Sequence, residues 1–153
     1  MIPKAFITEW RKHVPWLQDA HVEQDLIISR VLVELFNHQK ISNTVAFRGG
    51  TALYKLFIKP AARYSEDIDL VQIRAEPIGD LFAIIKETLE PFLGKAQWKL
   101  NQGRATLFYK FQPDGVTESS EKLKIEINTR KPEIAQAQNI LLSRHDVRNS
   151  LIN

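Results

Sequence analysis

The chain has 153 residues, of which 44% are hydrophobic and 25% are charged, and its formal net charge is +3. This composition is typical of a globular domain that is large enough to bury a core without cross-links. A charge of +3 is compatible with a nucleic acid partner, although it is too small to argue for one by itself.

The sequence shows no feature of a secreted or membrane-spanning protein. It contains no cysteine, so neither disulfides nor thiolate metal sites can form. No apolar run approaches the roughly 20 residues that span a bilayer. The first residues also lack the apolar core and cleavage site of a signal peptide. We therefore expect a cytoplasmic protein with no membrane partner.

Hydrophobic spacing and turn residues predict helices and strands along the chain. The expected elements are, in chain order, a helix over 4–14, a helix over 19–39, a strand over 44–48, a helix over 51–59, a strand over 66–73, a helix from Pro77 to Gly94, strands over 96–100 and 105–111, a polar loop over 112–120, a strand over 123–128 and a helix after Pro132. We expect Asp19 to be an N-cap and Ser42-Asn43 to form a turn. These elements predict one α+β (α/β) domain over residues 1–153, with a mixed sheet of about five strands flanked by helices.

The most informative motif is a pair of acids, Asp67 and Asp69, in a stretch that otherwise has the pattern of a strand. Alternate side chains of an extended chain point to one face, so the two carboxylates project together. Two neighbouring anions repel each other, and a cation between them removes that repulsion. The pair therefore predicts a metal site, and the alternative is a pair of solvated acids at a strand edge.

A glycine pair followed by a hydroxyl residue, Gly49-Gly50-Thr51, lies between an expected strand and an expected helix. The N–H groups and dipole at the start of a helix favour phosphate, glycine lets the phosphate approach, and Thr51 adds a hydroxyl donor. Arg48 and Ser65 are further candidates for holding phosphate or ordering the loop before the acids. The turn therefore predicts nucleotide binding, although paired glycines also occur in plain turns.

A third acid, Glu126, is the only one on the polar face of the alternating strand over 123–128. Two-metal nucleotidyl transfer uses carboxylates that hold two ions roughly 3.5–4 Å apart. Hard oxygen ligands without cysteine or paired histidines indicate Mg²⁺ or Mn²⁺ rather than zinc. The alternative for Glu126 is a surface ion pair with Lys124 or Lys110.

These motifs carry a resemblance to a known family. The segments Phe47-Arg48-Gly49-Gly50-Thr51-Ala52-Leu53 and Arg63-Tyr64-Ser65-Glu66-Asp67-Ile68-Asp69-Leu70 resemble the AbiEii-type nucleotidyltransferase toxins, of the DNA polymerase β-like nucleotidyltransferase superfamily. The segment Lys124-Ile125-Glu126-Ile127-Asn128 is similar to the part that carries the family's third acid. The resemblance implies a nucleotidyltransferase fold, NTP as substrate and Mg²⁺ as cofactor.

The resemblance also implies a biological role. It implies transfer of NMP to a hydroxyl, in some members at the 3′ end of tRNA, by the toxin of a toxin–antitoxin (abortive infection) system. A cognate antitoxin protein is then a partner. Members usually continue into a helical C-terminal region with further active-site residues, and we expect that region to be largely absent from this chain.

Two other functions fit the same residues. The chain could bind nucleotide or a protein partner without turnover, because the helical C-terminal part contributes to the active site in the family. A small-molecule (antibiotic) nucleotidyltransferase shares the same core and would label an aminoglycoside or a sugar instead of RNA.

Overall fold

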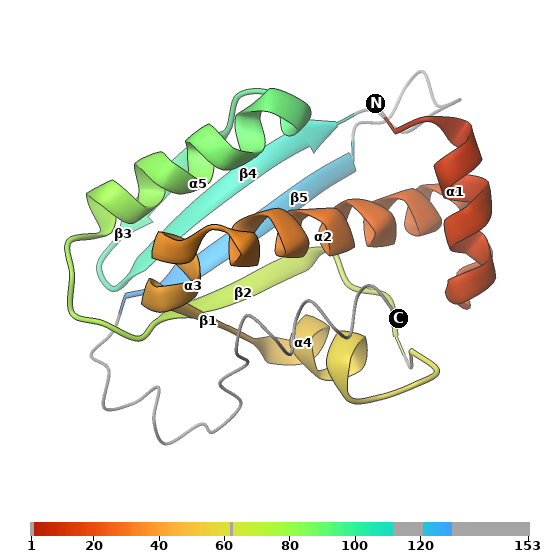
Figure 1. The fold of residues 1–153 in the computed structure, drawn as a ribbon, viewed down its shortest axis with the longest axis horizontal. Coiled ribbons are helices and arrows are strands. Elements are labelled where there is room, and N and C mark those ends of the chain that lie inside the picture. The colour runs from red at the N-terminus through yellow and green to blue at the C-terminus, as the bar shows by residue number, and fades with distance from the viewer. Residues whose placement is uncertain (1, 62, 112–120, 130–153) are drawn as a thin grey trace.

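The computed structural model describes residues 2–61, 63–111 and 121–129, and these form a five-stranded mixed sheet with helices packed on it (Figure 1). The elements are α1 (Lys4–Trp10), a 3-10 helix (Arg11–His13), α2 (Asp19–Asn37), α3 (Gln39–Thr44), β1 (Val45–Arg48), α4 (Gly49–Leu56), β2 (Asp67–Gln72), α5 (Ile78–Leu93), β3 (Gln97–Asn101), β4 (Arg104–Phe111) and β5 (Glu121–Asn128). Within these ranges, none of the helices has the length and apolar character that crossing a bilayer needs.

The strands lie in the order β1-β2-β5-β4-β3. The pairing is antiparallel except between β2 and β5, which are parallel neighbours although they are far apart in the sequence. The predicted mixed sheet of about five strands flanked by helices is therefore confirmed. The parallel pair is the part of this topology that positions the site.

One face of the sheet is covered by helices and carries the core. In Figure 1, α2 crosses over β2 and β5, and α5 lies over β3 and β4. Buried apolar residues alternate along the strands on this face: Ile68 and Leu70 of β2, Ala105, Leu107 and Tyr109 of β4, and Leu123, Ile125 and Ile127 of β5. Because successive side chains of a strand point to opposite faces, the residues between them project from the other face.

The structure corrects four predictions about where elements begin or turn, two of them around α2 and α3. Asp19 is the first residue of α2 and not its N-cap, which is Gln18. The turn predicted at Ser42-Asn43 is wrong, because both residues lie in α3. There the Ser42 hydroxyl donates to the Gln39 carbonyl, so the polar side chain is satisfied inside a helix.

The helix predicted from residue 51 begins at Gly49 and ends at Leu56, so the glycine pair belongs to α4 and does not separate it from β1. Pro77 is the N-cap of α5 and not its first helical residue, while Gly94 ends this helix as predicted. The predicted loop over 112–120 and the helix after Pro132 lie outside the described residues.

A buried polar cluster attaches α4 to the long helix α2. The ammonium of Lys55 lies 2.8 Å from Asp25 Oδ1 and donates to the Ser29 hydroxyl at 2.7 Å. Trp10 Nε1 donates to Asp25 at 2.8 Å, and the Tyr54 hydroxyl donates to Asp25 at 3.3 Å. Burial lowers the pKa of Lys55, while the charge of Asp25 and its hydrogen bond to Lys55 oppose that shift. The cluster therefore holds the helix that starts with the glycine pair in a defined position.

Candidate functional site

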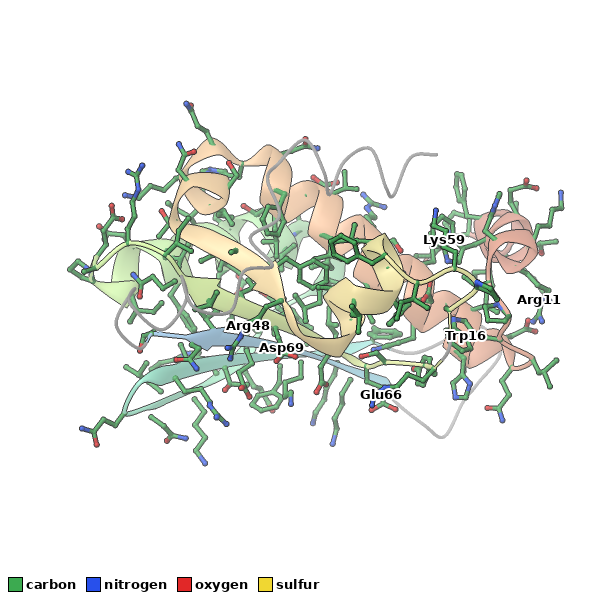
Figure 2. All side chains as sticks on the ribbon, turned by 90° about the horizontal axis from the view of Figure 1, so that it is seen from below. Arg11, Trp16, Arg48, Lys59, Glu66 and Asp69 are labelled. Atoms are coloured by element: carbon green, nitrogen blue, oxygen red, sulfur yellow. The ribbon has the colours of Figure 1, made fainter. Side chains whose placement is uncertain are left out.

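The register of the parallel pair brings the three predicted acids to one face of the sheet. Asp69 of β2 pairs with Glu126 of β5, and Asp67 pairs with Lys124. Directly paired residues project to the same face with their Cβ atoms about 5 Å apart. Glu126 therefore lies beside the aspartate pair, on the face opposite α2 and α5, where Figure 2 shows Asp69.

Two cations partly neutralise these acids. Lys124 Nζ lies 2.8 Å from Asp67 Oδ2 and 4.0 Å from Glu126 Oε2. Arg104 Nε of β4 lies 3.3 Å from Glu126 Oε1. Of the two partners considered for Glu126, Lys124 lies within 4.0 Å, whereas Lys110 pairs in register with Lys122; the nearer cation, Arg104, was not expected.

The position of Asp69 disfavours the charged form of its carboxyl. Burial raises the pKa of its carboxyl, and the neighbouring charges of Glu126 and Asp67 raise it further, while Lys124 and Arg48 oppose the shift. Arg48 is the last residue of β1 and pairs with Asp69 in the register (Figure 2). A half-buried anion next to two others is a site where an additional cation would be stabilised.

The glycine turn packs against the acidic strand. Gly49 has φ +84°, a left-handed conformation that side chains rarely adopt. A Cβ atom on Gly49 would lie 2.5 Å from Asp69 Oδ2, which is too close for any contact between these atoms. At Gly50, by contrast, a Cβ atom would meet only the Arg63 guanidinium, at 3.8 Å. Gly49 therefore allows the turn to touch Asp69, and Gly50 leaves space beside it.

Thr51 and Ser65 connect the turn to the start of β2. The Thr51 hydroxyl donates to the Asp67 carbonyl at 2.7 Å and lies 2.5 Å from the Ser65 hydroxyl. Because Thr51 has one hydroxyl proton and donates it to Asp67, Ser65 is the donor in the second bond. Both hydroxyls thus hold the protein's own loop, and in this arrangement the Thr51 donor predicted for phosphate is already used.

Gly49→Ala should lower the free energy of unfolding by about 1–3 kcal/mol, because it adds left-handed strain and a clash with Asp69. Urea denaturation measures this loss. Gly79→Ala in α5 is the matched control, since a Cβ atom there would meet nothing within 4 Å and the φ of Gly79 is not left-handed. That control should be neutral or slightly stabilising. Equal stability of the two variants would contradict the tight packing of Gly49.

The donor set fits a hard divalent cation in chemistry, since it consists of carboxylates from two adjacent strands. As the side chains stand, however, no three acids or histidines of the described ranges converge on one ion position. The Lys124 ammonium lies between Asp67 and Glu126 instead. The sequence suggests the contact of Lys124 with Glu126 but not the contacts of Lys124 with Asp67 and of Arg104 with Glu126, because those depend on which strands become neighbours.

The family follows from a comparison with known proteins. A family model described as nucleotidyl transferase AbiEii toxin, Type IV TA system, matches residues 30–146. The chain belongs to the AbiEii family. The matched range contains all five strands and every predicted site residue. No curated protein is similar enough in sequence to count as a relative.

Solved structures share the fold. MenT4, a nucleotidyltransferase toxin from Mycobacterium tuberculosis H37Rv, is 16% identical with a TM-score of 0.57, over 94% of this chain and 53% of that one. JHP933 from Helicobacter pylori is 21% identical with a TM-score of 0.53, over 75% of this chain and 46% of that one. The chain thus spans about half the length of the solved structures it resembles. At these identities the likeness shows that the fold is shared, while the AbiEii assignment rests on the family model.

Proposed function

We propose that the chain is a nucleotidyltransferase that moves NMP from an NTP to a hydroxyl acceptor and acts as the toxin of a toxin–antitoxin system in the cytoplasm. The observation that carries this proposal is the β2–β5 register, which pairs Glu126 with Asp69, the acid that lies against Gly49. Membership of the AbiEii family supports the same reaction class.

The acids would hold the cofactor. Asp67, Asp69 and Glu126 are proposed to bind Mg²⁺ or Mn²⁺, which would stabilise the charge that develops on the phosphates and lower the pKa of the acceptor hydroxyl. The acceptor oxygen forms a bond to the α-phosphorus of the NTP while the bond to pyrophosphate breaks. The hydroxyl proton passes to water. The role of the chain is to position these groups and to supply preorganised charge.

The triphosphate would lie at the start of α4. The first turn of a helix leaves backbone N–H groups without intrahelical partners, and its dipole favours anions. Gly50 has open space at its Cα, and the Arg63 guanidinium lies next to that space. Arg48 adds positive charge on the adjacent strand end. Thr51 and Ser65 are proposed to support this site by holding the turn against β2.

RNA, including tRNA, is proposed as the acceptor. The face of the sheet that carries the acids also carries basic side chains on three of its strands: Lys99 of β3, Arg104 and Lys110 of β4, and Lys122 of β5. Such a face attracts a phosphate backbone independently of its sequence. An antitoxin protein is proposed as a further partner because of the family.

Incubation of the purified chain with each labelled NTP, Mg²⁺ and total RNA tests the proposal. We expect labelled RNA with at least one NTP and none with the Asp67→Asn variant. Full labelling by that variant would contradict the assignment of the acids. Calorimetric NTP binding without turnover would favour the binding module, and a labelled aminoglycoside or sugar would favour the small-molecule enzyme.

A further inference from the structure

Lys124 occupies a central position among the acids that the proposed function assigns to the metal. Its ammonium is 2.8 Å from Asp67 Oδ2 and 4.0 Å from Glu126 Oε2. The charge of Asp69 acts on it as well, and hydrogen bonding to Asp67 is the main reason why the pKa of Lys124 is raised. One flexible cation thus contacts or faces all three carboxylates.

This position is built into the sheet. Lys124 is two residues from Glu126 on β5 and pairs with Asp67 on β2, so its side chain must project from the acidic face. On the other side it pairs with Phe108 of β4. Arg104 reaches Glu126 from β4, and its side chain is 54% exposed.

The ion pair is weak enough to exchange. The side chains of Lys124 and Asp67 are 34% and 41% exposed, and pairs of this exposure contribute at most about 1 kcal/mol. A lysine has a flexible stem and can leave without moving the backbone. A divalent cation at the same carboxylates would repel the ammonium, so the two cannot occupy these oxygens together.

We propose that Lys124 is a resident counter-ion that competes with the divalent cation for Asp67 and Glu126 and is released when the cation binds together with the NTP. This inference rests on the proposed function. Once displaced, the ammonium regains a partner in the triphosphate, so the NTP strengthens binding of the cation. Lys124 thereby couples the binding of the two ligands and disfavours binding of the cation in the absence of NTP.

The consequence is a pair of effects with opposite sign. Removing the charge in Lys124→Gln frees Asp67 and Glu126 and should tighten binding of Mn²⁺ alone by about fivefold. The same variant should lose most of the enhancement of Mn²⁺ binding by the nucleotide. If Lys124 only supported the fold, the Lys124→Gln variant would bind Mn²⁺ more weakly both alone and with the nucleotide.

Mn²⁺ titration followed by the EPR signal of the free ion tests this, with and without each of the four α,β-methylene nucleoside triphosphates. Lys99→Gln is the control, because it removes a positive charge from the same face on β3, two strands from Glu126. It should change Mn²⁺ affinity by less than about twofold, because charges that far apart are screened. Lys124→Arg keeps the charge and should bind Mn²⁺ like the wild type.

If Lys124→Gln binds Mn²⁺ as the wild type does, or more weakly, the inference is wrong. If the wild type transfers nucleotides in that case, the proposed function stands without it. If neither protein binds Mn²⁺ and no NTP is transferred, the metal site of the proposed function falls as well. Thermal melting of each variant confirms that folded protein is compared.

Discussion

Asp69→Asn is expected to lower nucleotide transfer by at least about a thousandfold and to raise the free energy of unfolding in metal-free buffer by about 1 kcal/mol. The amide has nearly the shape of the carboxylate, so the packing against Gly49 is retained. It carries no charge, and the half-buried position next to Glu126 and Asp67 then holds one anion fewer. Loss of activity would thus come with a gain in stability.

The stability gain should depend on pH. Because the pKa of Asp69 is raised in the folded protein, mainly by burial, the folded state binds its proton more tightly than the unfolded state does. The wild type therefore loses stability as pH rises from the ordinary aspartate pKa through the raised value, and Asn does not. The difference in free energy of unfolding between Asp69→Asn and the wild type should be small below about pH 3.9 and constant well above the raised pKa of Asp69.

Thermal melts at pH 3.5 and 7.5 in the presence of EDTA, together with the labelled-NTP assay, measure both effects. Glu87→Gln makes the same chemical change at an exposed position of α5 and should alter stability by less than about 0.5 kcal/mol at either pH. A destabilised Asp69→Asn variant at pH 7.5 would contradict the account of crowded charge. An active one would contradict the role proposed for the acid.

The strands and the acidic face can be predicted because their pattern is local. Alternation in β5 assigns Leu123, Ile125 and Ile127 to the core and leaves Glu126 on the polar face, as the structure has it. The parallel neighbour of that strand cannot be derived from alternation. For this reason the sequence does not predict the pair of Asp67 with Lys124, although both residues lie in patterned strands.

Other features depend on contacts that no local pattern contains. Ser42 and Asn43 favour turns by residue type, whereas in α3 the Ser42 hydroxyl bonds to a helical carbonyl and the segment is helical. Asp25 lies in a helix with a clear apolar stripe, and only the approach of Lys55, thirty residues later, explains why its carboxylate is buried. The amphipathic pattern identifies the helix but not the ion pair inside it.

Lys55→Met should lower the free energy of unfolding by about 3–5 kcal/mol, because it removes one partner of a buried ion pair. The side chains of Lys55 and Asp25 are only 5% and 2% exposed, so water cannot replace the lost ammonium. The remaining bonds from Trp10 and Tyr54 do not neutralise the carboxylate. The contact of Lys55 with Asp25 holds α4 against α2, and α4 begins with Gly49. The Gly49 turn should therefore also be less well ordered in this variant.

Urea denaturation of the single and double variants measures the pair. Asp25→Asn combined with Lys55→Met should be more stable than Lys55→Met alone, because the double variant leaves no uncompensated buried charge. Lys86→Met is the control: its pair with Glu90 spans 3.9 Å with side chains 34% and 32% exposed. It should cost less than about 1 kcal/mol. If Lys55→Met cost no more than this exposed pair, the buried cluster would not be what fixes α4 to α2.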